Sequence, residues 1–452
     1  MSPYNLSMKA SPWTIRSLRP ALASGNLNPI ALAEEALAHS GKNPSRNTYL
    51  WQDAAWTLSE VARVQAMPRG AGGPFADGGP FGDGRPALWG LPLSVKDCFD
   101  LAGAPTSCGT RFYRDLHPKE PNDSWLVQQL RASGAVIIGK THLHPLAYGI
   151  TGENPEFGDC LQPGNPTALT GGSSSGAVAS VLEGSVVAAI GTDTGGSVRV
   201  PASLSGLAGY RATLGRGDWS GGVHLGESFD TMGWLFRDLE DAPLLAAPFA
   251  PADSAPQPAF TRFAAVPDSF LHDCEPEIVE NFHSVIQEMK ALGLEGHTID
   301  VPWWANSTDI FAPIQAWEAA RLHAGHFELI QPAIRERLQW GASISGPEIA
   351  ALRLRHAAFN ARIDELFAEH ELLLLPCAPV ARLTAGADHS KTRPRLLRYT
   401  TPFSLAGVPA VAIPCILGGM QLAAARGNDK PLLQIAARLG AQRNAMSATT
   451  EQ

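Results

Sequence analysis

Two short glycine- and serine-rich segments most strongly constrain what this chain can fold into. The first covers residues 171–176, GGSSSG, and the second covers residues 191–199, GTDTGGSVR. Residues 177–183 between them have the composition of a helix start, and residues 186–190 are a brief apolar run before a glycine, which predicts a buried strand. The first serines therefore open a helix. Ser197 follows the end of a strand, where it is a candidate N-cap of the next helix.

The predicted position of Ser197 favours chemistry at its hydroxyl. A hydroxyl at a helix N-terminus lies among unpaired backbone N–H groups that carry a partial positive charge. The small residues before Ser197 allow their amides to turn toward one point, where they can stabilise the oxyanion formed when a carbonyl is attacked. The same glycines also suit a plain strand-to-helix turn or a phosphate-binding loop. This segment alone leaves all three interpretations open.

A lysine at the end of an earlier strand is the candidate base, because an unaided serine hydroxyl is a poor nucleophile. Residues 89–97, WGLPLSVKD, predict a strand that ends at Lys96. As a base this amine must be neutral, so its pKa must fall from about 10.4 to near 7, which takes about 4 kcal/mol of desolvation and hydrogen bonding. The alternative is a surface lysine paired with Asp97. Lys140, at the end of the strand predicted for residues 136–140, is a rival base.

Lys96 and the two segments together resemble the signature of the amidase signature family of serine hydrolases. That pattern has a GGSS-type loop, then GTDxGGSxRxP, with a lysine on an earlier strand. Ser173 and Ser197 lie 24 residues apart, which fits the family. The resemblance implies that Ser197 is the nucleophile and Lys96 the terminal base. Ser173 would be the middle member, usually held by a cis peptide bond.

The resemblance also implies the other parts of the site. Lys140 becomes a structural residue, and amide hydrolysis needs neither a metal nor an organic cofactor. Asp193 and Arg199 flank the nucleophile, and we expect them to pair and brace the turn. The backbone amides expected to form the oxyanion hole are those of Thr194, Gly195 and Gly196. The residues expected to line the acyl pocket are Ala147, Tyr148 and Gly149.

Within the family the chain is most similar to the plant-type indole-3-acetamide amidases and related bacterial amidases. Residues 152–154, 173–175 and 228–238 carry this likeness. It implies a small primary amide, with an aryl-acetamide favoured by Tyr148 and the tryptophans. One alternative is a glutaminase-type subunit that supplies ammonia to a partner amidotransferase, although such subunits usually have glycine where Ser175 stands. Another is a non-catalytic interaction module, but such relatives typically lose the lysine or the serines.

Two other motifs compete for this region of the chain. Residues 172–176 match the G-x-S-x-G elbow of α/β-hydrolases, but that motif requires a strand directly before it, and residues 162–166 predict a turn. His142 and His144 form an HxH pair with no evident third ligand, so a zinc site is disfavoured.

Composition limits the classes of partner and compartment. A net charge of −8 with no Lys/Arg run argues against nucleic-acid binding. The six cysteines are scattered singly, so neither a disulfide framework nor a zinc ribbon is indicated, and Cys98 near Lys96 is interpreted as a small buried hydrophobe. With no signal peptide and no apolar run long enough to span a membrane, we expect a cytoplasmic protein. The expected partner is a small amide, and a homodimer is possible.

The alternation of predicted helices and strands indicates an α/β protein. We expect an α/β/α sandwich with a mixed central sheet covered by helices on both faces, forming one amidase domain over residues 1–452. Its expected parts are N-terminal helices (1–66), a Gly/Pro-rich surface loop (67–87), the signature core (88–245), a connector with covering helices (246–370), the C-terminal part of the core (371–440) and a frayed tail (441–452).

Overall fold

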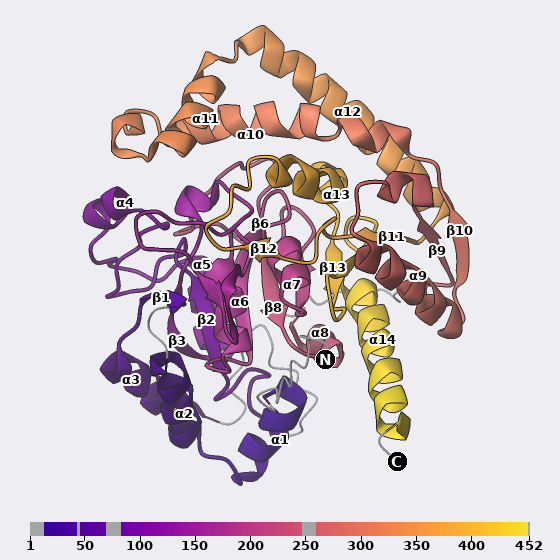
Figure 1. The fold of residues 1–452 in the computed structure, drawn as a ribbon. Helices are drawn as coiled ribbons and strands as arrows, with labels where there is room; N and C mark the ends of the chain where they lie inside the picture. Colours follow the sequence, from indigo (N-terminus) through magenta and orange to yellow (C-terminus); the bar gives the residue numbers. More distant parts are fainter. Residues whose placement is uncertain (1–12, 43–45, 69–82, 246–258, 451–452) are drawn as a thin grey trace.

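A mixed sheet of eleven strands runs through the centre of the molecule (Figure 1). The computed structural model describes residues 13–42, 46–68, 83–245 and 259–450. In their order across the sheet, the strands are β1 (Tyr49–Trp51), β3 (Val136–Thr141), β2 (Pro92–Lys96), β6 (Ala188–Asp193), β8 (Thr231–Phe236), β7 (Ala208–Arg211), β13 (Ala410–Ile413), β14 (Met420–Ala424), β11 (Leu372–Pro376), β9 (Arg262–Ala265) and β10 (Glu295–Thr298).

Strands β2, β3 and β6 are parallel to one another, as are β9, β10 and β11, whereas antiparallel pairs join the strands between these groups. The strands from β3 to β11 across the sheet are buried at every position. Successive side chains of a strand point to opposite faces, so burial of every residue requires cover on both faces. The predicted sandwich with a mixed central sheet is confirmed.

Helices supply this cover, and side-chain caps mark the start of several of them. Asn28 and Asp53 cap the helices that follow them, each accepting a backbone N–H with its side chain. The α-helices are α1 (Ile15–Ser24), α2 (Pro29–Gly41), α3 (Ala54–Gln65), α4 (Arg111–Leu116), α5 (Trp125–Ala132), α6 (Ser175–Leu182), α7 (Arg199–Leu204), α8 (Ala242–Leu245), α9 (Pro276–Ala291), α10 (Thr308–Leu322), α11 (Pro332–Ser343), α12 (Gly346–Glu369), α13 (Thr392–Ala406) and α14 (Asp429–Thr450).

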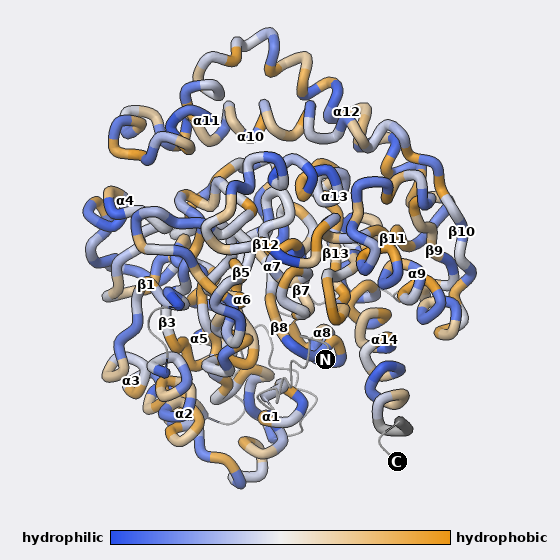
Figure 2. The backbone as a smooth tube through the Cα atoms, in the orientation of Figure 1, coloured by the Kyte–Doolittle hydropathy of each residue, from blue (hydrophilic) through white to orange (hydrophobic). Residues whose placement is uncertain are grey.

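Two groups of helices position the site described below. Helix α6 packs on β2, β3, β6 and β8, while α10 and α12 pack on α13 from outside. Figure 1 shows α10, α11 and α12 as an orange layer above α13. In Figure 2 hydrophilic and hydrophobic residues alternate along these outer helices. Short 3-10 helices occur at η2 (Pro145–Ala147), η3 (Leu239–Asp241), η4 (Asp268–Leu271), η5 (Pro302–Asn306) and η6 (Phe327–Leu329).

A second sheet of three strands corrects one expectation. Its strands are β12 (Leu383–Thr384), β5 (Asn165–Leu169) and β4 (Leu161–Gln162). Residues 162–166, expected to be turn only, form the tip of the hairpin between β4 and β5. The hairpin belongs to this small sheet and not to the central one.

The C-terminus also differs from expectation. The closing helix α14 continues to Thr450, so the frayed tail predicted for residues 441–452 is helical over its described part. Arg443 holds this segment, because it pairs with Glu288 at 2.7 Å and donates to Pro414 O. The surface loop predicted for residues 67–87 falls largely on residues 69–82, which lie outside the described residues. The predicted connector starts at residue 246, and residues 246–258 also lie outside them.

Two composition-based expectations can be compared with the structure. All six cysteines are free. Within the described ranges, no helix combines the length and the apolar character needed to cross a bilayer.

Candidate active site

The three residues proposed to carry the chemistry come from segments that meet at one edge of the central sheet. Strands β2 and β6 are parallel neighbours, with Val95 opposite Ile190, so their carboxyl ends reach the same edge. Lys96 is the last residue of β2, and Ser197 lies in the turn after β6. Ser173 lies just before α6, which packs on both strands. Ligands of open α/β sheets bind at this kind of edge.

The amine of Lys96 is surrounded by hydroxyl groups. Its Nζ donates to Ser173 Oγ and to Thr192 Oγ1, both at 2.7 Å, and to Ser174 Oγ at 3.2 Å. The side chain is fully buried. Burial lowers the pKa of Lys96 from its ordinary value of 10.5, because desolvation disfavours the charged form. An uncharged amine in this position can accept a proton from Ser173.

The thiol two residues after Lys96 does not act as a competing nucleophile. Cys98 is fully buried, and burial raises the pKa of this thiol to about 12. The thiol is therefore neutral near pH 7, where a cysteine nucleophile would need to be a thiolate. A neutral thiol also supplies no negative charge that would keep Lys96 protonated.

Ser173 is held by its backbone as well as by Lys96. The peptide bond between Gly172 and Ser173 is cis. The N–H of Gly172 donates to Ile150 O at 2.9 Å, and the N–H of His144 donates to Ser173 O at 3.1 Å. These contacts fix the loop on both sides of the hydroxyl, which is fully buried.

Ser197 lies next to this pair but is not the N-cap that the sequence predicted. Helix α7 begins at Arg199 and its N-cap is Val198, with no side-chain cap. The carboxylate of Asp193 performs the capping role, because it accepts the N–H groups of Val198 at 3.2 Å and Arg199 at 3.3 Å. The hydroxyl of Ser197 is therefore not used to cap the helix, and Ser197 is one of the residues that line a cavity.

The predicted pairing of Asp193 with Arg199 is confirmed and includes a third residue. Asp193 Oδ1 lies 2.9 Å from Arg199 and 3.0 Å from Arg211, and all three side chains are fully buried. Burial alone would raise the pKa of Asp193, but the two guanidinium groups outweigh it and hold this pKa well below its ordinary value. The ionised carboxylate fixes the turn that presents Ser197.

The predicted oxyanion-hole amides differ in availability. The N–H of Gly196 donates to Asp193 Oδ1 at 2.8 Å, so this amide is already engaged. Within the described residues, no hydrogen bond occupies the N–H groups of Thr194, Gly195 or Ser197, and Gly195 and Ser197 line the cavity. Gly196 has a φ of 121°, and a Cβ there would lie 2.7 Å from Thr400 Oγ1, so this position requires glycine.

Lys96 and Ser173 form a direct hydrogen bond. Ser197 is connected to this pair by a backbone hydrogen bond to Ser174, the residue after Ser173. The N–H of Ser174 donates to Ser197 O at 3.3 Å. No hydrogen bond between the hydroxyls of Ser173 and Ser197 is formed in the part of the chain that the structure describes. Catalytic hydrogen bonds are often long without substrate and tighten in the reacting complex.

The cavity beside Ser197 contains all three predicted pocket residues. It has a volume of about 20 Å³, room for about one water molecule. The residues that line it are Ala147, Tyr148, Gly149, Ile150, Gly195, Ser197, Leu225, Gln315, Arg393 and Leu397.

The rival base is engaged elsewhere. Lys140 pairs with Asp97 at 2.7 Å and donates to Pro105 O and Thr106 Oγ1. Asp97 therefore pairs with Lys140. The alternative in which Lys96 is a surface lysine paired with Asp97 is wrong.

The HxH pair also has a structural setting. His142 shares hydrogen bonds with Ser175 Oγ at 2.9 Å and Gly158 O at 2.8 Å, and burial lowers its pKa to about 4. The described residues contain no group of three or more His, Cys, Asp or Glu side chains arranged to hold a metal.

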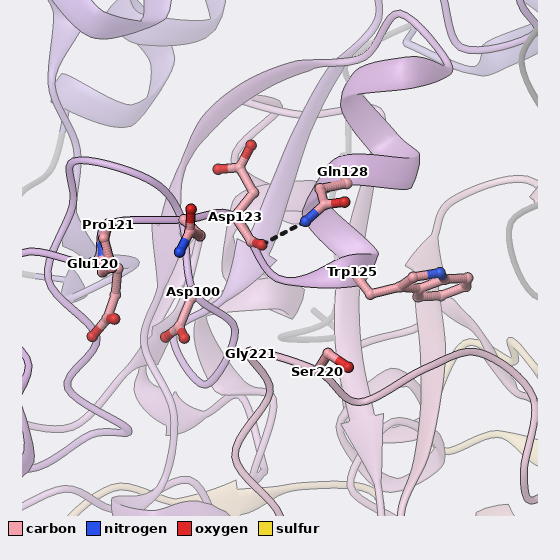
Figure 3. Close-up of a pocket in the computed structure, with 9 residues that line it drawn as sticks. Asp100, Glu120, Pro121, Asp123, Trp125, Gln128, Ser220 and Gly221 are labelled. Carbon is pink, nitrogen blue, oxygen red and sulfur yellow. Dashed lines mark hydrogen bonds between the residues drawn. The ribbon is translucent and has the colours of Figure 1, made fainter.

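A larger cavity of about 460 Å³ lies apart from these residues (Figure 3). Asp100, Glu120 and Asp123 give it an acidic lining, and burial raises the pKa of Asp100 above its ordinary value. It contains none of the three proposed catalytic side chains, so its size does not make it the active site.

Comparison with known proteins assigns the chain to a family. The Amidase family model matches residues 76–433. The chain is 29% identical to the 2-amino-5-chloromuconic acid deaminase of Comamonas testosteroni, with 90% of each chain covered, and 29% identical to the indoleacetamide hydrolase of Pseudomonas savastanoi, with 93% and 94% covered. A glutamyl-tRNA(Gln) amidotransferase subunit from a Cyanothece species is 28% identical, with 89% and 91% covered.

A solved structure supports the same assignment. A crystal structure of an amidase matches with a TM-score of 0.83 and 28% identity, covering 95% of this chain and 99% of that one. The chain belongs to the Amidase family and is an amide-hydrolysing enzyme.

Sequence reasoning missed several residues of the site. Thr192 lies inside the second serine-rich segment, one residue before Asp193, so its place at the end of β6 beside Lys96 could have been inferred from strand pairing. Gln315 and Arg393 line the cavity from helices more than 100 residues away in the sequence. Nothing in their local sequence indicates this position.

Proposed function

We propose that this enzyme hydrolyses a small primary carboxamide to a carboxylate and ammonia through an acyl-enzyme on Ser197. Lys96 is the base and Ser173 relays the proton. The observation that carries the proposal is the environment of Lys96, which is fully buried and donates to three hydroxyls. Desolvation of this kind favours the neutral amine, which is the form that can act as a base.

Acylation is a coupled transfer of protons and a change of bonds at the carbonyl carbon. Neutral Lys96 takes the proton of Ser173, and Ser173 takes the proton of Ser197 while Ser197 Oγ bonds to the carbonyl carbon. The carbon–nitrogen bond then breaks, and the proton returns through the same hydroxyls to the leaving nitrogen, which departs as ammonia. Water attacks the resulting ester by the same relay and releases the carboxylate.

Backbone amides stabilise the negative charge that develops on the carbonyl oxygen. Those of Thr194, Gly195 and Ser197 are available for this, whereas Gly196 holds the turn through Asp193. Removing one oxyanion-hole donor typically costs roughly 10²–10³ in kcat. The proposed substrate contacts are Ala147, Tyr148 and Gly149, which line the cavity with Ser197.

The relatives support two versions of the reaction. The similarity to indoleacetamide hydrolase supports a small amide as the substrate. The similarity to an amidotransferase supports the alternative, ammonia supply from glutamine to a partner. We favour the first version because Ser175 stands where the glutaminase-type subunits usually have glycine. A cytoplasmic location and a homodimer stay predictions, the first supported by six free thiols.

Ammonia release from a panel of amides tests the proposal. The panel contains indole-3-acetamide, phenylacetamide, benzamide, glutamine and a simple aliphatic amide, assayed with wild type and with Ser197→Ala. We expect wild-type turnover of at least one small amide, no turnover by the variant, and a mass increase on Ser197 after treatment with a serine-directed phosphonate. Ordinary turnover by Ser197→Ala would exclude this nucleophile. Turnover of glutamine alone, dependent on a second polypeptide, would favour the alternative.

A further inference from the structure

One face of helix α13 lies against the turn that carries the proposed nucleophile. Arg393, Leu397 and Thr400 are spaced i, i+4 and i+7, so they share a face of the helix. Thr400 Oγ1 donates to Gly195 O at 2.5 Å, and a Cβ on Gly195 would lie 3.3 Å from Leu397 Cδ2. Arg393 lies one turn before Leu397, toward the N-terminus of α13, about 6 Å from it along the helix axis. Arg393 lines the same cavity as Ser197.

The guanidinium of Arg393 has no anionic partner in the described residues. Its Nε is buried and makes no hydrogen bond, and no ion pair includes this side chain. The pKa of Arg393 falls to about 10, because burial and the neighbouring cation of Arg337 disfavour its charged form. The phenol of Tyr148 acts in the opposite direction. The group therefore stays protonated at neutral pH. The residue is half-buried, with its Nε inaccessible to solvent, so an anion supplied from outside the chain would stabilise this partly desolvated charge.

The second arginine near the cavity is already used. Arg337 donates to Tyr148 O at 2.7 Å and lies 5.5 Å from the centre of the Tyr148 ring. It fixes a wall of the cavity and adds positive potential, and it leaves Arg393 as the guanidinium that can bind a ligand. Between Ser197 and Arg393 the cavity walls include Ile150, Leu225 and Leu397.

We propose that Arg393 binds a second carboxylate on the acyl group of the substrate, so that the preferred substrate is a monoamide of a dicarboxylic acid. This rests on the proposed function, since Ser197 must attack the amide end. The part of the substrate between the two ends is an apolar chain or ring, which matches the apolar walls. Guanidinium and carboxylate form a charge-assisted hydrogen-bonded pair, frequently bidentate. A neutral aryl-acetamide leaves Arg393 unpaired and is a poorer substrate.

Matched pairs of amides test this specificity. Each pair contains an anionic amide and a neutral one of similar size: succinamate with butyramide, glutaramate with pentanamide, and terephthalamate with 4-methylbenzamide. In wild type, we expect kcat/KM for the best anionic amide to exceed that for its neutral partner by at least about tenfold. In Arg393→Gln that ratio falls by about 10–100-fold. The control is Arg355→Gln, which removes an exposed charge from α12 outside the cavity lining and leaves the ratio as in wild type.

Binding to an inactive variant separates this inference from the proposed function. Calorimetry with Ser197→Ala should detect the best anionic monoamide, and Arg393→Gln in that background should weaken binding at least about tenfold, whereas Arg393→Lys keeps part of it. Binding that depends on Arg393 without any turnover by wild type would refute the amidase mechanism and keep the carboxylate site. Turnover that depends on Ser197, with equal kcat/KM for both members of every pair and no effect of Arg393→Gln, would overturn the carboxylate site alone.

Discussion

Replacing Asp193 with asparagine should strongly destabilise the fold and the turn at Ser197. The change removes a negative charge that lies within 3.0 Å of both Arg199 and Arg211, and all three side chains are fully buried. Removing one partner of a buried ion pair costs about 3–5 kcal/mol, because the remaining charge stays desolvated and unpaired. The carboxylate also accepts the N–H groups of Gly196 and Val198, which the amide of asparagine satisfies only in part.

Urea unfolding followed by tryptophan fluorescence measures this loss. The control is Glu328→Gln, which breaks a pair with Arg335 but changes a side chain that is 81% exposed, and which should cost less than about 1 kcal/mol. We expect Asp193→Asn to lower the free energy of unfolding by about 3–5 kcal/mol and to lower kcat. A loss no larger than that of Glu328→Gln would refute the role assigned to the Asp193 cluster.

Three further predictions concern single positions. Lys96→Met keeps the length of the side chain without its amine, so we expect kcat to fall by a factor of about 10²–10⁴ with an unchanged circular dichroism spectrum. Wild-type activity of this variant would contradict the assignment of Lys96 as the base. Burial raises the pKa of Glu183 from 4.5 to about 7, so the folded state binds the proton more tightly and stability falls as pH rises from 4.5 to 7. Glu183→Gln should reduce that decline in urea unfolding measured at pH 5 and pH 8, and an unchanged decline would exclude Glu183 as a source of it. Gly196→Ala places a Cβ 2.7 Å from Thr400 Oγ1 at a φ of 121°, so thermal unfolding should occur at a lower temperature. An unshifted transition would show that the turn accommodates a side chain.

The central part of the fold and the segments that meet at the site could be predicted from sequence because local patterns specify them. The apolar run before Lys96 becomes β2, and the run before Asp193 becomes β6, each buried at every position. The family resemblance implied that Lys96, Ser173 and Ser197 act together. The order of the strands was not predicted, because it depends on pairing between distant segments.

Local rules failed where a distant or neighbouring group replaced the expected partner. Ser197 fits the preference for an N-cap, but Asp193 accepts the N–H groups of Val198 and Arg199 in its place. The family resemblance implied that Gly196 donates to the oxyanion, and in the structure its N–H donates to the same carboxylate. Arg393 reaches the cavity only because α13 packs beside the turn. The position of Arg393 is set by tertiary packing, which no local pattern encodes.

The ionisation of Lys96 tests the central claim most directly. The protein can be labelled with ¹³C at the ε-carbon of lysine, and the Lys96 signal can be assigned by its absence in Lys96→Met. We predict that this signal titrates below the ordinary pKa of 10.5, and that kcat/KM for the best amide falls with the same pKa as pH is lowered. A signal that stays protonated up to the ordinary pKa while the enzyme is fully active at neutral pH would contradict the account.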